Sequence, residues 1–159
     1  MPRTPSSLPY DAPPCDPRLA RAALRYRMNT PQLTTPQFLG AINVTAWLYR
    51  DERGVEDVQV NANTTIIKII EQFGPAATPD AEVGIHSEMM AAEWFRSKRG
   101  LKVLQIFSER IPCSKMCAPM LKHYFPGIPW YYYYNMSMWR EGGTFIKTAG
   151  QVLKTVYEL

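Results

Sequence analysis

The chain has 159 residues, of which 46% are apolar and 20% are charged, and its formal net charge is +4. This length suits one domain with a single core and excludes two full-sized domains, while the positive charge is compatible with a nucleic-acid partner. No apolar run approaches the roughly 20 residues that cross a bilayer and the N-terminus lacks the apolar segment of a signal peptide, so we expect a soluble protein without a membrane partner.

The first seventeen residues are rich in proline, at positions 2, 5, 9, 13, 14 and 17. Proline removes a backbone donor and fixes φ, and a stretch of this composition is typical of a linker. We therefore predict a flexible leader without regular structure over residues 1–17 and a single domain over residues 18–159. Cys15 stands alone in the leader and is expected to be a free thiol at the surface.

A short basic amphipathic helix is predicted next, from Arg18 to Met28. Apolar residues recur on one of its faces, and three arginines form a stripe on the opposite face, at positions 18, 21 and 25. Beyond a breaker stretch, two β-prone runs at 38–49 and 55–61 flank the turn residues 51–54 and predict an antiparallel hairpin.

The rest of the chain alternates between helical and β-prone segments. Residues 64–73 are ambiguous between the two, and residues 74–80 read as a loop. The later segments are a helix at 87–99, a strand at 101–107, a helix at 113–124, a strand at 129–134, a short final strand at 144–147 and a helix at 149–157. A hairpin followed by this alternation predicts an α/β fold, with helices packed on a sheet.

Two short motifs carry the residues with metal-site chemistry. The first is His86-Ser87-Glu88, and the second, one helix and one strand later, is Pro112-Cys113-Ser114-Lys115-Met116-Cys117. One imidazole and two thiolates provide three ligands for a tetrahedral Zn²⁺ and leave a fourth position for water, as in catalytic zinc sites. The alternatives are a structural zinc with a further ligand elsewhere, or a chance coincidence of two common patterns.

The spacing of these residues restricts where they can meet. Cys113 and Cys117 are four residues apart and share one face of a helix, whose N-terminal dipole favours the thiolate. His86 and Glu88 point about 200° apart in a regular helix, so they can share a site only at a helix mouth. We therefore place the predicted site where two helices begin.

His-x-Glu followed by Pro-Cys-x-x-Cys is the signature of zinc-dependent nucleobase deaminases. The order of elements over residues 38–147 resembles the cytidine deaminase-like fold, and the two motifs look most like those of bacterial polymorphic-toxin deaminases. One departure is that three residues, not two, separate the cysteines, with Met116 where the second cysteine is usual. Spacings of three and four both return to one helical face, so the geometry survives.

This resemblance implies a three-layer α/β fold with a mixed five-stranded sheet and helices on its faces. It also implies zinc held by His86, Cys113 and Cys117, with Glu88 as the catalytic proton carrier outside the metal shell. A toxin domain of this kind would be delivered into the cytoplasm of a target cell by a larger secreted protein and neutralised by an immunity protein. We expect a monomer.

The predicted activity is conversion of cytosine to uracil in nucleic acid. Single-stranded DNA is the leading substrate because its bases need no extraction from a duplex. Alternatives in the same chemistry are double-stranded DNA, RNA, free nucleosides or nucleotides, and adenine as the target base. An alternative from another class is a nucleic-acid-binding module that keeps zinc for stability.

Five further residues are candidates for substrate contacts. The asparagines of the hairpin side are candidates for holding the sugar or the base edge, at Asn43, Asn61 and Asn63. Tyr134 or Trp139, near the end of the strand predicted to approach the zinc, is a candidate for stacking on a base, with packing at the rim as the alternative. The arginine stripe and the lysines and arginines around the site helices could contact phosphates.

Overall fold

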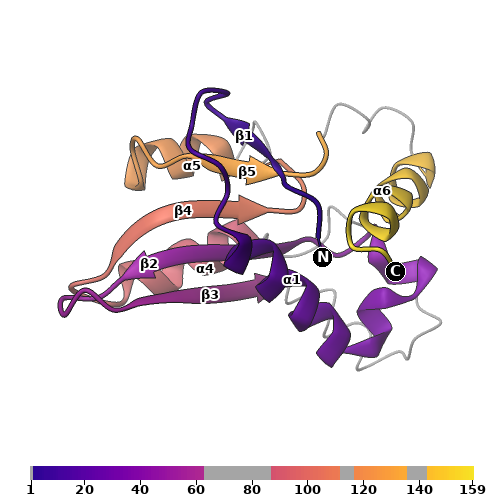
Figure 1. Ribbon diagram of the computed structural model, residues 1–159, viewed down its shortest axis with the longest axis horizontal. Helices are drawn as coiled ribbons and strands as arrows, with labels where there is room; N and C mark the ends of the chain where they lie inside the picture. The colour runs from indigo at the N-terminus through magenta and orange to yellow at the C-terminus, as the bar shows by residue number, and fades with distance from the viewer. Residues whose placement is uncertain (1, 63–86, 112–116, 136–142) are drawn as a thin grey trace.

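A computed structural model of the chain describes residues 2–62, 87–111, 117–135 and 143–159. Its described elements are helices and a five-stranded mixed sheet with the strand order β1-β5-β4-β2-β3 (Figure 1). They are β1 (Ser6–Leu8), α1 (Pro17–Asn29), the 3-10 helix η1 (Pro31–Thr34), α2 (Pro36–Leu39), β2 (Val44–Arg50), β3 (Glu56–Ala62), α4 (Ser87–Arg96), β4 (Lys102–Ser108), α5 (Cys117–Tyr124), β5 (Trp130–Tyr132) and α6 (Gly143–Val156).

The predicted hairpin is confirmed as β2 and β3, which pair antiparallel from Val44 opposite Ala62 to Arg50 opposite Glu56. The carboxylate of Asp51 closes the turn by accepting hydrogen bonds from the amides of Arg53 and Val55, at 2.8 and 3.0 Å. Gly54 has a φ of +81°, which a residue without a Cβ adopts at no steric cost.

The centre of the sheet is β4, which pairs antiparallel with β2 and parallel with β5. A parallel pair requires a crossover connection, and α5 lies in the one between β4 and β5. The predicted α/β class with a mixed sheet is confirmed, and the described elements form three layers.

Alternate side chains of the central strands enter two different cores, as the period of a strand requires. On one face, Trp47 of β2 and Ile106 of β4 are fully buried against α4 and α5. Trp47 stacks on Phe95 of α4, with ring centroids 5.1 Å apart. Ala46, Leu48 and Phe107 point to the opposite face and belong to the larger core.

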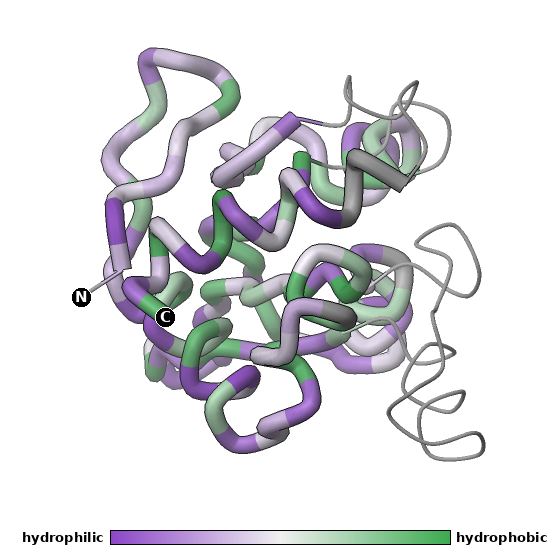
Figure 2. Tube along the Cα trace, turned by 90° about the vertical axis from the view of Figure 1, so that its right-hand side faces the viewer, coloured by the Kyte–Doolittle hydropathy of each residue, from purple (hydrophilic) through white to green (hydrophobic). Residues whose placement is uncertain are grey.

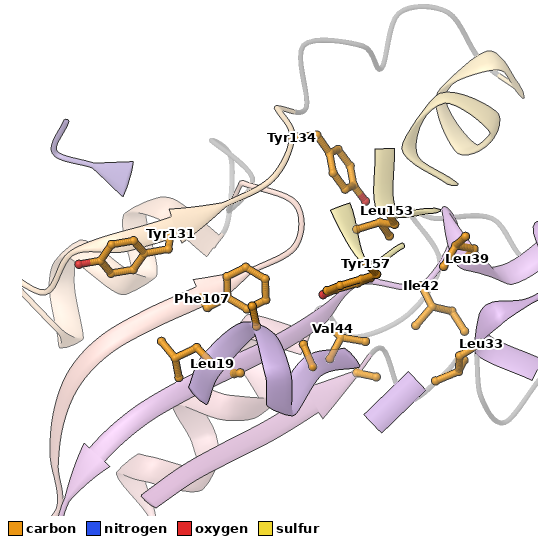
Figure 3. Close-up of a cluster of buried hydrophobic side chains, with 14 of the residues drawn as sticks. Leu19, Leu33, Leu39, Ile42, Val44, Phe107, Tyr131, Tyr134, Leu153 and Tyr157 are labelled. Atoms are coloured by element: carbon orange, nitrogen blue, oxygen red, sulfur yellow. The ribbon is translucent and has the colours of Figure 1, made fainter. Parts of the chain in front are cut away.

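The larger core lies under α1, α2 and α6. Figure 3 shows Leu153 of α6 and Tyr157, the residue after α6, converging with Leu39 and Ile42. Hydrophilic and hydrophobic residues are interspersed along the helical parts of the tube in Figure 2, as expected for helices with one covered face. Arg3 N donates to Val156 O at 3.0 Å, so the two ends of the chain lie side by side.

A buried ion pair crosses this core. Arg27 of α1 donates from Nε and Nη2 to the two carboxylate oxygens of Glu109, at 2.9 and 2.7 Å. Val44 N donates to Glu109 Oε1 at 2.9 Å, and the Tyr157 hydroxyl donates to Oε2 at 2.6 Å. We call Arg27, Glu109 and Tyr157 the Glu109 clamp. It joins α1, the end of β4 and the segment after α6.

The clamp is dry, and its ionisation states follow from that. Both side chains of the ion pair are fully buried. Burial alone would lower the pKa of Arg27, but the charge and hydrogen bonds of Glu109 raise it above its ordinary value. Burial and then the Glu109 charge hold the pKa of Tyr157 well above its ordinary value. Arg27 is therefore charged and the Tyr157 phenol is neutral.

The prediction that residues 1–17 hold no regular structure is wrong. Ser6–Leu8 forms β1, which pairs antiparallel with β5 at the edge of the sheet. The Tyr131 hydroxyl donates to Pro13 O at 2.7 Å, and Asp16 N donates to Gln105 Oε1 at 2.8 Å. Prolines are tolerated here because an edge strand leaves one row of amides unpaired. Cys15 is buried in the larger core, not a surface thiol.

Two other segments differ from expectation. Residues 144–147, predicted as a strand, belong to α6, which runs for 14 residues. The strand predicted from residue 38 begins only at Val44, because Pro36–Leu39 forms α2. The ambiguous segment 64–73 and the predicted loop 74–80 lie outside the described residues. Across the ranges that are described, no helix has the length and apolar character needed to span a bilayer.

Candidate active site

Four elements bring polar side chains together at one edge of the sheet. Glu88 lies in the first turn of α4, Cys117 begins α5, Ser108 ends β4, and Asn43 directly precedes β2. All four side chains are buried, and Glu88 is only 3% exposed. The first turns of the two helices that carry the sequence motifs therefore meet beside the end of the central strand.

One carboxylate oxygen of Glu88 is held by neutral donors. Asn43 Nδ2 donates to Glu88 Oε1 at 3.0 Å, and the Ser108 hydroxyl lies 2.8 Å from the same oxygen. This arrangement fixes the orientation of the Glu88 side chain.

The asparagine is itself held by the backbone and by neighbouring hydroxyls. Its Oδ1 accepts from Arg110 N at 3.0 Å, and its Nδ2 is also close to Ser87 Oγ and Ser108 Oγ, at 3.1 and 2.9 Å. The Ser108 hydroxyl has Arg110 O as a second acceptor, at 2.5 Å. Asn43 is 1% exposed, so this network is closed to solvent.

The other oxygen of Glu88 faces a thiol. Cys117 Sγ lies 3.7 Å from Glu88 Oε2, and Cys117 is fully buried. The described part of the site supplies one side chain of a type that binds Zn²⁺, the Cys117 thiol, and a cation beside it would offset the repulsion between a thiolate and the nearby carboxylate. The site can therefore combine a metal ligand with a proton-accepting group.

The remaining predicted ligands lie outside the described residues. These are His86 and Cys113, and Met116 in the same motif also lies there. Among the ranges described, no three side chains of His, Cys, Asp or Glu gather in a group that could hold a metal ion. The predicted ligand set is thus represented here by Cys117, and the predicted proton carrier by Glu88.

The candidate substrate contacts are placed unevenly. Asn61 lies in β3, opposite Thr45, and its side-chain oxygen accepts from Gln59 Nε2 at 3.3 Å. Asn43 faces Glu88, as described above. Asn63 and Trp139 are outside the described residues.

Tyr134 lies at the site end of β5, next to Arg110 in an isolated parallel bridge. It is 5% exposed, and Figure 3 shows its ring above Leu153, so the structure presents it as a packed ring and not as an open stacking surface. Burial raises the pKa of Tyr134 to about 12, with the Glu88 charge among the smaller causes. Tyr134 is therefore neutral at physiological pH.

The two serines of this site were not among the residues predicted from the sequence. Ser87 is the middle residue of the first motif, and Ser108 is the last residue of β4. Neither fits a periodic pattern. The available signal was the change from the apolar strand residues to Ser108-Glu109-Arg110, because polar residues at a strand end next to a motif are candidates for a site.

Comparison of the chain with models of protein families, with curated proteins and with solved structures gave no match.

Proposed function

We propose that the chain is a zinc-dependent hydrolytic deaminase that converts cytosine to uracil in nucleic acid, with single-stranded DNA as the substrate. The observation that carries the proposal is the 3.7 Å approach of Cys117 Sγ to Glu88 Oε2, across 29 positions of sequence. Glu88 belongs to the first motif and Cys117 to the second, so the two motifs that suggest one zinc site are in contact.

The topology adds support. The hairpin of β2 and β3 precedes α4, β4, α5 and β5, and both motif helices begin at the edge of the sheet where β4 ends. This is the arrangement expected of a cytidine deaminase-like three-layer fold. Here the fifth strand of the sheet is β1, from the N-terminal segment.

His86, Cys113 and Cys117 would hold the zinc. When bound, the metal supplies Lewis acidity that makes water a competent nucleophile near neutral pH. Glu88 would accept a proton from the attacking water and return protons to the ring nitrogen and the departing amine. Cytosine and water then become uracil and ammonia, and the carboxylate ends in its starting state.

Polymer substrates are favoured by charge. The net charge of +4 favours association with phosphates, and Arg18, Arg21 and Arg25 are exposed along α1. Arg18 also pairs with Asp16 and Glu56. The proposal includes the role of a bacterial toxin domain with an immunity protein as its partner.

The test is incubation of the zinc-loaded protein with single-stranded DNA, double-stranded DNA and RNA, followed by sequencing, and with free cytidine, followed by ammonia release. We expect C-to-T changes in single-stranded DNA. A-to-G changes would move the target to adenine, and ammonia from free cytidine alone would move it to nucleosides. No reaction with any of them would favour a zinc-stabilised nucleic-acid-binding module.

Two variants test the assignment of roles. Glu88→Gln should keep its zinc and lose deamination by at least about a thousandfold, because the amide cannot accept the proton. Cys117→Ala should lose zinc, whereas Met116→Ala, the matched control, should keep it. Full turnover by Glu88→Gln would contradict the mechanism, and loss of zinc from Met116→Ala alone would show that the ligand spacing is misread.

A further inference from the structure

We infer that Asn43 is a positioning residue for Glu88 and not a substrate contact. This inference deepens the proposed function and rests on it for the role of Glu88. Its observation is independent of that role: both polar atoms of a fully buried side chain are engaged with the protein, and one of them holds the carboxylate.

The hydrogen-bonding capacity of the Asn43 side chain is used within the protein. An asparagine amide has two N–H donors and a carbonyl oxygen. Three acceptors surround Asn43 Nδ2 within 3.1 Å, on Ser87, Glu88 and Ser108, and Oδ1 accepts from Arg110 N at 3.0 Å. The two donors therefore have more acceptors than they can serve, and at 1% exposure the side chain presents no edge to a ligand.

The partners of Asn43 come from two different elements. Ser87 and Glu88 begin α4, while Ser108 and Arg110 lie at the end of β4. Asn43 thus links the mouth of the helix to the edge of the sheet. A side chain in this place sets the position of Glu88 relative to the strand, and through it the reach of the Oε2 atom that faces Cys117.

Asn43 and Ser108 share one carboxylate oxygen, Glu88 Oε1. Ser108 has one hydroxyl hydrogen and two acceptors, Glu88 Oε1 at 2.8 Å and Arg110 O at 2.5 Å. When that hydrogen points to Arg110 O, Asn43 supplies the remaining described donor to Glu88 Oε1, at 3.0 Å. Asn43 can therefore hold the carboxylate in either orientation of the Ser108 hydroxyl.

The experiment compares Asn43→Leu, which keeps the volume of the side chain but removes its donors, with Asn29→Ala, an exposed asparagine at the end of α1. On the zinc-loaded protein, Asn43→Leu should lower kcat about 10- to 100-fold, as outer-shell partners do. KM should stay within about twofold, and zinc content should be unchanged. Asn29→Ala should match the parent protein in all three.

A second measurement needs no activity. Thermal midpoints are recorded for Asn43→Leu, Glu88→Ala and the double variant. We expect Asn43→Leu to lower the midpoint by roughly 5 °C in the presence of Glu88 and by a smaller amount in the Glu88→Ala background. The hydrogen bond to Glu88 is already absent there, whereas the contacts with Ser87, Ser108 and Arg110 are lost in both backgrounds.

The outcomes separate the two proposals. A raised KM with kcat retained would overturn the inference and return Asn43 to the substrate. Additive midpoint shifts would also overturn it. Coupled midpoints in a protein that deaminates nothing would support the contact between Asn43 and Glu88 and would locate the failure in the proposed function.

Discussion

Two glutamates, Glu88 and Glu109, are buried at the same edge of the sheet and have different surroundings. Glu109 accepts four hydrogen bonds, two of them from the Arg27 guanidinium. Glu88 accepts on Oε1 from the neutral side chains of Asn43 and Ser108, and its Oε2 faces a thiol. All four lone pairs of the Glu109 carboxylate accept hydrogen bonds, whereas the Glu88 carboxylate is held through Oε1.

The difference separates structure from chemistry. A carboxylate that is neutralised by a buried cation and filled with donors cannot take up a proton without breaking the clamp. A carboxylate held on one oxygen keeps the other for proton transfer. Ser108 and Glu109 are neighbours in sequence at the end of β4. Ser108 contacts Glu88 on one side of the sheet, and Glu109 pairs with Arg27 on the other.

The largest expected effect is on the free energy of unfolding, and it appears when glutamine replaces each of the two glutamates in turn. Glu109→Gln leaves the Arg27 charge buried without its anion and should lower the free energy of unfolding by about 3–5 kcal/mol. Glu88→Gln removes a charge whose described donors are neutral, and should change it by less than about 1 kcal/mol. Urea unfolding of the two zinc-loaded variants measures both values. Equal losses would remove the distinction between the two glutamates.

Much of the fold follows from local pattern. The hairpin of β2 and β3 was predictable because its strands are β-prone and its turn residues stand between them. The edge strand β1 was missed because proline argues against strands, although an edge tolerates it. Residues 144–147 were predicted as a strand because they are β-prone. In the structure they belong to the 14-residue helix α6, since the β-propensity of four residues is weaker than the tertiary context.

The sequence indicates those residues of the candidate site whose type is required by the chemistry. It does not indicate the residues that only support them. Glu88 and Cys117 were identifiable from the motif spacing. Their supports were not, because any hydroxyl or amide at the right distance would serve. Arg27 had a signal that went unused: it follows Leu19 and Ala23 at spacings of four, on the apolar face of α1.

A smaller effect tests the saturation of Glu109. Tyr157→Phe removes the hydroxyl that donates to Glu109 Oε2 at 2.6 Å, and should lower the free energy of unfolding by about 2 kcal/mol, as expected for a buried hydrogen bond to a charged group. Tyr133→Phe is the matched control, because its hydroxyl also donates at 2.6 Å but at the exposed Arg3 O. It should cost below about 0.5 kcal/mol. Similar losses from both variants would mean that Glu109 does not depend on its fourth donor.

The smallest expected effect is on the pH dependence of stability, and it tests whether water reaches the core on the Glu109 side of the sheet. Cys15 belongs to the same core as Tyr157, and burial, followed by the Asp16 charge, raises the pKa of its thiol to about 12. A raised pKa means that the folded state holds the proton more tightly than the unfolded state. The stability contribution is therefore complete below pH 9 and declines as the pH rises from 9 towards 12.

Between pH 7.5 and 9.5, the parent protein should lose about 0.8 kcal/mol more of its free energy of unfolding than Cys15→Ala does, since only the parent can ionise this thiol on unfolding. Urea titrations under reducing conditions at the two pH values measure the difference, and every other titrating group is common to both proteins. Parallel losses in the two proteins would show that the thiol reaches water in the folded state. The leader would then cover the core less tightly than the pairing of β1 with β5 indicates.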